Sequence, residues 1–145
     1  MTNSKPPVQS YKDLEVWQKS MDMVTAVYQV TKEFPKDELY TLTNQIRRSA
    51  ISVPSNIAEG RGKRSTGDYI RFLNIAYGSI SELETQLIIS KNLGYVSSGK
   101  LDSLFTDINR IGRMLNGLIS SLEGKQTTSR RIPNPESRIP VNDDA

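Results

Sequence analysis

The side chains best suited to chemistry in this sequence are basic, and they lie close together in it. Residues 47 to 71 include six basic side chains and two acidic ones, a local excess of +4, whereas the whole chain has a net charge of +3. The six basic residues are Arg47, Arg48, Arg61, Lys63, Arg64 and Arg71. Such groups bind phosphate oxygens, so we expect a nucleic-acid-binding site. The same side chains could equally form a solvated surface that only keeps the protein soluble.

The backbone around these residues also suits a phosphate. Gly60 and Gly62 flank Arg61, and glycine lets a backbone approach a ligand closely. Ser65 and Asp68 have the spacing of a helix cap, and the N-terminus of the helix that they start would add N–H donors and a favourable dipole. The sequence has no recognition-helix motif, no zinc finger and no aromatic pair of the ribonucleoprotein type, so we expect binding that is independent of sequence.

A second group of polar residues surrounds a proline. Pro54, Asn56, Glu59 and Gly60 lie in one short stretch, and Asn56 and Glu59 could form a small polar site. The chain has no histidine and no cysteine, which removes the usual general base, the usual transition-metal ligands and the thiol nucleophile. We therefore expect no catalytic residues, no metal site, no cofactor and no enzyme activity.

Aromatic residues near the basic stretch allow two interpretations. Tyr69, Phe72 and Tyr77 could stack on exposed bases, yet aromatics at helical spacing usually belong to the core. Arg47 and Arg48 are adjacent on a predicted helix, about 100° apart, so we expect one of them to pair with a carboxylate such as Glu82 or Glu84.

Four apolar stripes with helical spacing must position these residues. The first runs through Leu14, Trp17, Met21, Val24, Tyr28 and Thr31, with Asp13 as its expected cap. The second runs through Leu42, Ile46, Ala50, Val53 and Ile57, in a helix expected to end at Glu59. The third contains Tyr69, Leu73, Ala76, Ile80, Leu83 and Leu87, and the fourth contains Leu101, Leu104, Ile108, Ile111, Leu115, Leu118 and Leu122. Short connections between them predict an all-α, antiparallel, up-down-up-down four-helix bundle.

The second helix of this bundle is expected to be kinked. Pro54 cannot donate to the carbonyl of Ala50, which costs about 3 kcal/mol unless neighbours compensate. The predicted domain spans residues 11–123, between a flexible lead (1–10) and a disordered tail (124–145) that begins where Gly124 ends the last helix. No apolar run could span a bilayer and no secretory signal is present, so we expect a cytoplasmic protein without membrane contact.

Several blocks of the sequence resemble one bacterial family. YKDLEVWQKS, FPKDELYTLTNQIRRSAISVPSNIAEGRGK and DYIRFLNIAYGSISELETQL are similar to the four-helix-bundle proteins encoded by intervening sequences of 23S rRNA genes. The resemblance covers about residues 11 to 122 and implies no catalytic residues. It also implies a homopentamer, because this family and the similar accessory protein of diversity-generating retroelements form five-subunit barrels. A pentamer would repeat the basic surface five times, and the analogy favours RNA as the ligand.

The sequence supports one alternative function. The third helix has apolar residues outside its stripe, namely Ile70, Phe72, Ile75, Tyr77, Ile88 and Ile89. The outer side of the second and third helices could therefore contact another protein, with the protein acting as an interaction scaffold.

Overall fold

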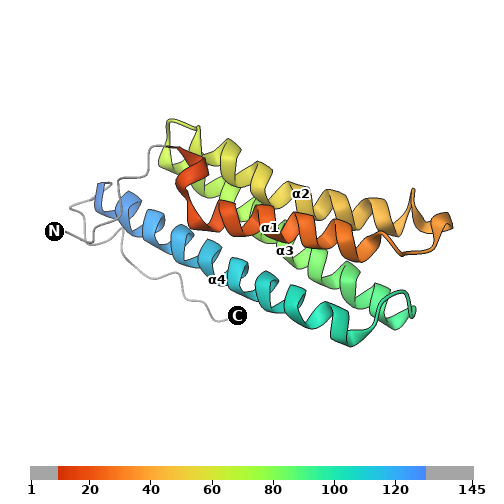
Figure 1. The fold of residues 1–145 in the computed structure, drawn as a ribbon. Coiled ribbons are helices and arrows are strands. Elements are labelled where there is room, and N and C mark those ends of the chain that lie inside the picture. The colour runs from red at the N-terminus through yellow and green to blue at the C-terminus, as the bar shows by residue number, and fades with distance from the viewer. Residues whose placement is uncertain (1–9, 130–145) are drawn as a thin grey trace, which may run out of the picture.

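The described part of the protein is built from four long helices. The computed structural model describes residues 10–129, and every regular element within them is helical. The helices are α1 (Glu15–Thr31), α2 (Leu42–Arg61), α3 (Thr66–Asn92) and α4 (Ser98–Ser129). Each packs against the next in the chain and α4 packs against α1, which closes the bundle (Figure 1). The predicted all-α, up-down-up-down architecture is confirmed.

The core confirms the predicted stripes of α2, α3 and α4. In α2, Ile46, Ala50, Val53 and Ile57 have no exposed side-chain surface. The predicted apolar positions of α3 from Leu73 onward and of α4 from Leu101 to Leu115 are buried as well. Each fully buried Leu or Ile contributes about 1.5–3 kcal/mol, so these three stripes supply most of the driving force for folding.

The predicted stripe of α1 is only partly right: Thr31 is buried and Leu14, Trp17 and Val24 pack against the core, but Met21 and Tyr28 do not. The face that packs into the core consists of Val16, Ser20, Met23, Val27 and Thr31. Met21 and Tyr28, which the prediction placed inside, are 43% and 39% exposed. Two hydroxyls can be buried because each donates to the carbonyl one turn earlier: Ser20 to Val16 at 2.7 Å, and Thr31 to Val27 at 2.8 Å.

The ends of the helices agree only partly with the sequence. Ser65 caps α3 as expected, its hydroxyl accepting from the amide of Asp68 at 3.1 Å. Before α1, Ser10 caps a 3-10 turn (Tyr11–Asp13), so Asp13 is not the cap of the long helix. Gly94, with a φ of 79°, lets the chain turn away after α3.

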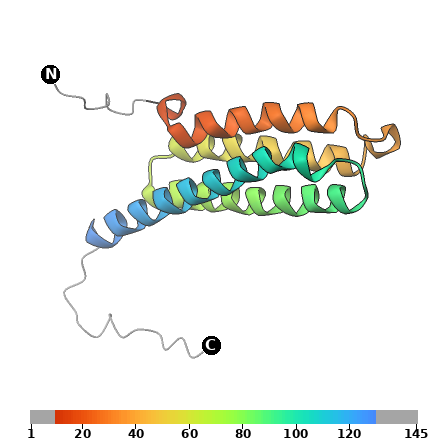
Figure 2. The same cartoon turned by 60° about the horizontal axis from the view of Figure 1, so that its bottom comes forward.

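The C-terminal helix is longer than predicted. α4 continues through Gly124 to Ser129, so the expected end of the helix at Gly124 is wrong. Its last turns extend beyond the connection between α2 and α3 (Figure 2). Residues 1–9 and 130–145, where a flexible lead and most of a disordered tail were predicted, lie outside the described residues.

Pro54 lies inside α2 without ending it. The helix runs from Leu42 to Arg61 and the proline side chain is buried. The predicted kink itself stays a prediction. Among residues 10–129, no helix has the length and apolar character required to cross a membrane.

Candidate nucleic-acid interface

Four of the six basic residues gather where α2 ends and α3 begins. Arg61 is the last residue of α2, Lys63 and Arg64 lie in the connection, and Arg71 lies in the second turn of α3. The connection is short because Ser65 starts the next helix at once. Two antiparallel helices therefore bring side chains that are up to ten positions apart to one end of the bundle.

Gly60 makes this arrangement possible. A Cβ atom at position 60 would lie 2.8 Å from Cβ of Phe72 and 3.0 Å from Cδ1 of Tyr69. Any larger residue would push α2 away from α3, so the role of Gly60 is close helix packing. The sequence analysis grouped Gly60 with the polar residues around Pro54. In the structure it lies next to Arg61, the first of the basic residues.

The charges in this region are only partly compensated. Lys63 Nζ lies 3.7 Å from Glu59, and Arg71 Nε lies 3.8 Å from Asp68. Both pairs are exposed, and such pairs contribute about 0–1 kcal/mol, so a phosphate can compete for either cation. Arg64 is exposed and forms no ion pair with any residue in the described range.

Two of the three predicted aromatics belong to the same region. The ring of Phe72 lies beneath two cations, 5.2 Å from Lys63 Nζ and 4.6 Å from the guanidinium carbon of Arg71. Tyr69 is half-buried, and burial raises the pKa of its hydroxyl although Arg61 opposes the shift. Tyr77 instead lies on the α4 side of α3, beside Gly112.

Arg47 and Arg48 lie elsewhere. Arg47 Nε donates to Thr31 Oγ1 at 2.9 Å, and its guanidinium lies 4.6 Å from the centre of the Tyr28 ring. Arg47 thus joins α2 to α1. Arg48 is exposed on the other side of α2, and no ion pair with Glu82 or Glu84 forms, so the expected carboxylate pair is wrong. Arg48 and Arg61 are separated by about 20 Å of helix.

The polar residues near Pro54 form a network between α2 and α3. Asn56 Nδ2 donates to the carbonyl and the hydroxyl of Ser52, at 2.8 and 2.9 Å. The Ser52 and Ser79 hydroxyls are 2.8 Å apart, which connects the two helices. Glu59 is paired with Lys63, so it does not join Asn56 in a common site. The described range has no group of three or more His, Cys, Asp or Glu residues able to bind a metal.

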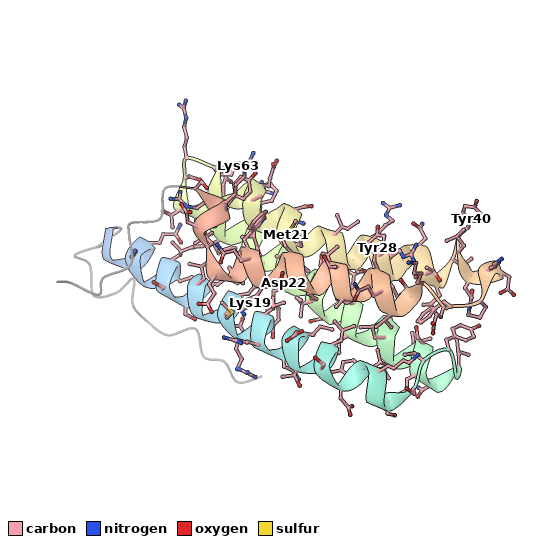
Figure 3. The ribbon with its side chains drawn as sticks, viewed as in Figure 1. Lys19, Met21, Asp22, Tyr28, Tyr40 and Lys63 are labelled. Carbon is pink, nitrogen blue, oxygen red and sulfur yellow. The ribbon has the colours of Figure 1, made fainter. Side chains whose placement is uncertain are left out.

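A groove around Arg48 was not anticipated. It is lined by one residue just before α2 and by residues of the start of α2 and the middle of α3: Tyr40, Asn44, Gln45, Arg48, Ser49, Glu82 and Gln86. Tyr40 is 86% exposed, the highest value among the exposed large hydrophobic residues of the described chain. Figure 3 shows Tyr40 and Lys63 at opposite ends of the bundle. The sequence contains one indication of this surface: Tyr40 is a large aromatic residue that belongs to none of the four apolar stripes.

The comparisons with known proteins agree with this architecture. A sequence profile of the family described as 23S rRNA-intervening sequence protein matches residues 12–117. A similar solved structure is a protein of unknown function from the S23 ribosomal protein family of Bacteroides thetaiotaomicron. It shares 26% sequence identity with a TM-score of 0.65, over 72% of this chain and 97% of the other. No curated protein matches. Because the profile spans most of the four helices, this chain belongs to the 23S rRNA-intervening sequence protein family.

Proposed function

We propose that this protein is a non-enzymatic, cytoplasmic nucleic-acid-binding protein that acts as a homo-oligomer. The observation that supports binding most directly is the group of four basic residues at the α2–α3 connection, Arg61, Lys63, Arg64 and Arg71. Two of them, Lys63 and Arg71, form weak, exposed ion pairs with neighbouring carboxylates. The family name connects these proteins with rRNA genes, which favours RNA over DNA.

The oligomer in this proposal is the homopentamer that the family resemblance implies. Exposed apolar side chains between α1 and α2 support an association surface: Met21 and Tyr28 on α1 and Ile51 on α2 are 39–43% exposed. Five copies of the basic group would act together, so a weak affinity for each copy would give strong overall binding. A native mass equal to one chain at micromolar concentration would contradict the oligomer.

Charge reversal tests the binding surface. We expect the triple variant Arg61→Glu, Lys63→Glu, Arg64→Glu to lose binding to single-stranded RNA at low salt. For the wild type, log K should fall with log salt, and losing three phosphate contacts should reduce the slope by about 2 for each chain.

A matched control changes the net charge equally at the other end of the bundle. Lys32, Lys36 and Lys91 are exposed, lie away from the α2–α3 connection, and form no ion pairs within the described range. Reversing the charge of these three lysines should leave most of the affinity for single-stranded RNA intact. If both triple variants bind RNA as the wild type does, the proposed binding surface is wrong.

A protein-interaction scaffold is the second candidate. It is favoured by exposed isoleucines on the α3 part of the outer side of α2 and α3, where Ile75, Ile88 and Ile89 are 42–43% exposed. In this case, serine at these positions would abolish capture of a protein partner, while the charge reversals would not.

A further inference from the structure

The groove around Arg48 contains hydrogen-bonding groups without partners. Within the described residues, Arg48 and Glu82 form no ion pair, and the buried Oε1 atom of Gln86 accepts no hydrogen bond. A buried acceptor without a partner is unfavourable and rare in folded proteins. The groove therefore presents one exposed donor, Arg48, and one exposed acceptor, Glu82. The Gln86 Oε1 atom is buried beneath it, and turning that side chain toward a ligand would give the atom a partner.

Tyr40 adds a flat apolar surface at the edge of the same groove. Its ring is 86% exposed and projects outward from the bundle (Figure 3). Unpaired bases stack on exposed aromatic rings, and their edges are then available for hydrogen bonds. A ring beside unsatisfied polar groups is the arrangement that such a base requires.

The polar groups favour guanine among the bases. Guanine presents the acceptors O6 and N7, which match an arginine side chain such as Arg48. It also presents the N1–H and N2–H₂ donors, which match the carboxylate of Glu82 and the Oε1 atom of Gln86. Adenine has one exocyclic donor and no N1–H, and the pyrimidines lack the N7 acceptor, so none of them satisfies both sides of the groove.

We propose that the groove between the start of α2 and the middle of α3 binds an unpaired guanine base, stacked on Tyr40 and read by Arg48, Glu82 and Gln86. This inference rests on the proposed nucleic-acid-binding function and adds a base preference to it. Arg48 lies on the same helix as Arg61, the first residue of the basic group at the α2–α3 connection, and about 20 Å of helix separates them. One strand could contact both sites, with phosphates at one end and a base at the other.

The test uses the full chain and labelled single-stranded RNA, with binding followed by fluorescence anisotropy. The probes are oligouridines with one central guanosine, adenosine or inosine; inosine lacks the exocyclic amine. The variants are Tyr40→Ala, Glu82→Gln and the triple charge reversal. Leu39→Ala is the matched control, because Leu39 is an exposed neighbour that does not line the groove.

We expect the guanosine probe to bind most tightly, and Tyr40→Ala to weaken it by about tenfold or more. Glu82→Gln should reduce the preference for guanosine over inosine, while Leu39→Ala should change neither value. Equal affinity of wild type and Tyr40→Ala for the guanosine probe would overturn the inference. If, in that case, the triple charge reversal still abolished RNA binding, the proposed nucleic-acid-binding function would stand and only the base site would be wrong.

Two other outcomes would also overturn the inference. If the wild type binds none of the probes at low salt, the proposed function fails and the base site fails with it. If Tyr40→Ala changes the native mass of the protein, Tyr40 is a contact between copies of this chain. The groove is then an interface and no base site.

Discussion

Replacing Gly60 by alanine tests the packing that brings the basic residues together. In the wild type, α2 approaches α3 so closely that a Cβ atom at position 60 would lie 2.8 Å from Phe72 Cβ and 3.2 Å from the carbonyl oxygen of Tyr69. Neither atom is the end of a flexible side chain, so the two helices must separate to admit a methyl group. We therefore expect Gly60→Ala to destabilise the bundle.

The size of the effect follows from two opposing terms. Inserting a methyl group into a closely packed interior costs about 1–3 kcal/mol. Alanine improves helix propensity by at most about 1 kcal/mol, and less here because position 60 is in the last turn of α2. The net loss should be about 1–2 kcal/mol, which lowers Tm by about 4–8 °C in a chain of this size.

Gly78→Ala is the matched control. Gly78 also lies inside a helix, α3, but a Cβ atom there would meet nothing within 4 Å. We expect this variant to be more stable than the wild type by about 1 kcal/mol, from helix propensity alone. Both variants would be melted by circular dichroism at one protein concentration, since association shifts Tm. If Gly60→Ala is as stable as Gly78→Ala, the close approach of α2 to α3 is wrong.

Two further predictions concern α1 and the connecting loops. In urea denaturation at a protein concentration at which the chain is a monomer, Met23→Ala should cost about 2–5 kcal/mol and Met21→Ala less than about 0.5 kcal/mol, because the two residues are 1% and 43% exposed. Equal costs would show that the stripe predicted from the sequence is the buried one. Hydrogen bonds from Thr41 and Tyr95 lower the pKa of Glu38 from its ordinary value of 4.5, so their stabilisation is present above that value and lost as pH falls through the lowered pKa. Tyr95→Phe should thus lower Tm at about pH 7 and have little effect at about pH 3, and an equal loss at both would refute this.

The success of sequence-based reasoning differed between helices for a physical reason. In α2, the large apolar residues other than Ile51 occupy one face, so only one stripe can be buried. In α1, Met21 and Met23 belong to two different apolar stripes, and hydropathy alone does not choose between them. Thr31 belongs to both stripes, but the buried stripe also contains Ser20, which looks unsuitable for a core. Its hydroxyl donates to the carbonyl of Val16, as the Thr31 hydroxyl donates to that of Val27. A pattern of residue types does not show those hydrogen bonds.

Only part of the candidate site could be predicted from the sequence. Residues that are close in sequence but on one straight helix lie far apart in space, whereas residues on either side of a turn lie close together. Arg61 and Arg71 are ten positions apart but lie at the same end of the bundle, because the chain reverses between them. Arg48 and Arg61 are only a little further apart in sequence, yet the straight rise of α2 separates them by about 20 Å. The six basic residues therefore cannot contact one phosphate group together. In the proposed function, one strand long enough to span that distance contacts both Arg48 and the basic residues at the α2–α3 connection. Reversing the charge of Arg48 alone should therefore weaken the binding of long RNA more than the binding of RNA too short to reach both.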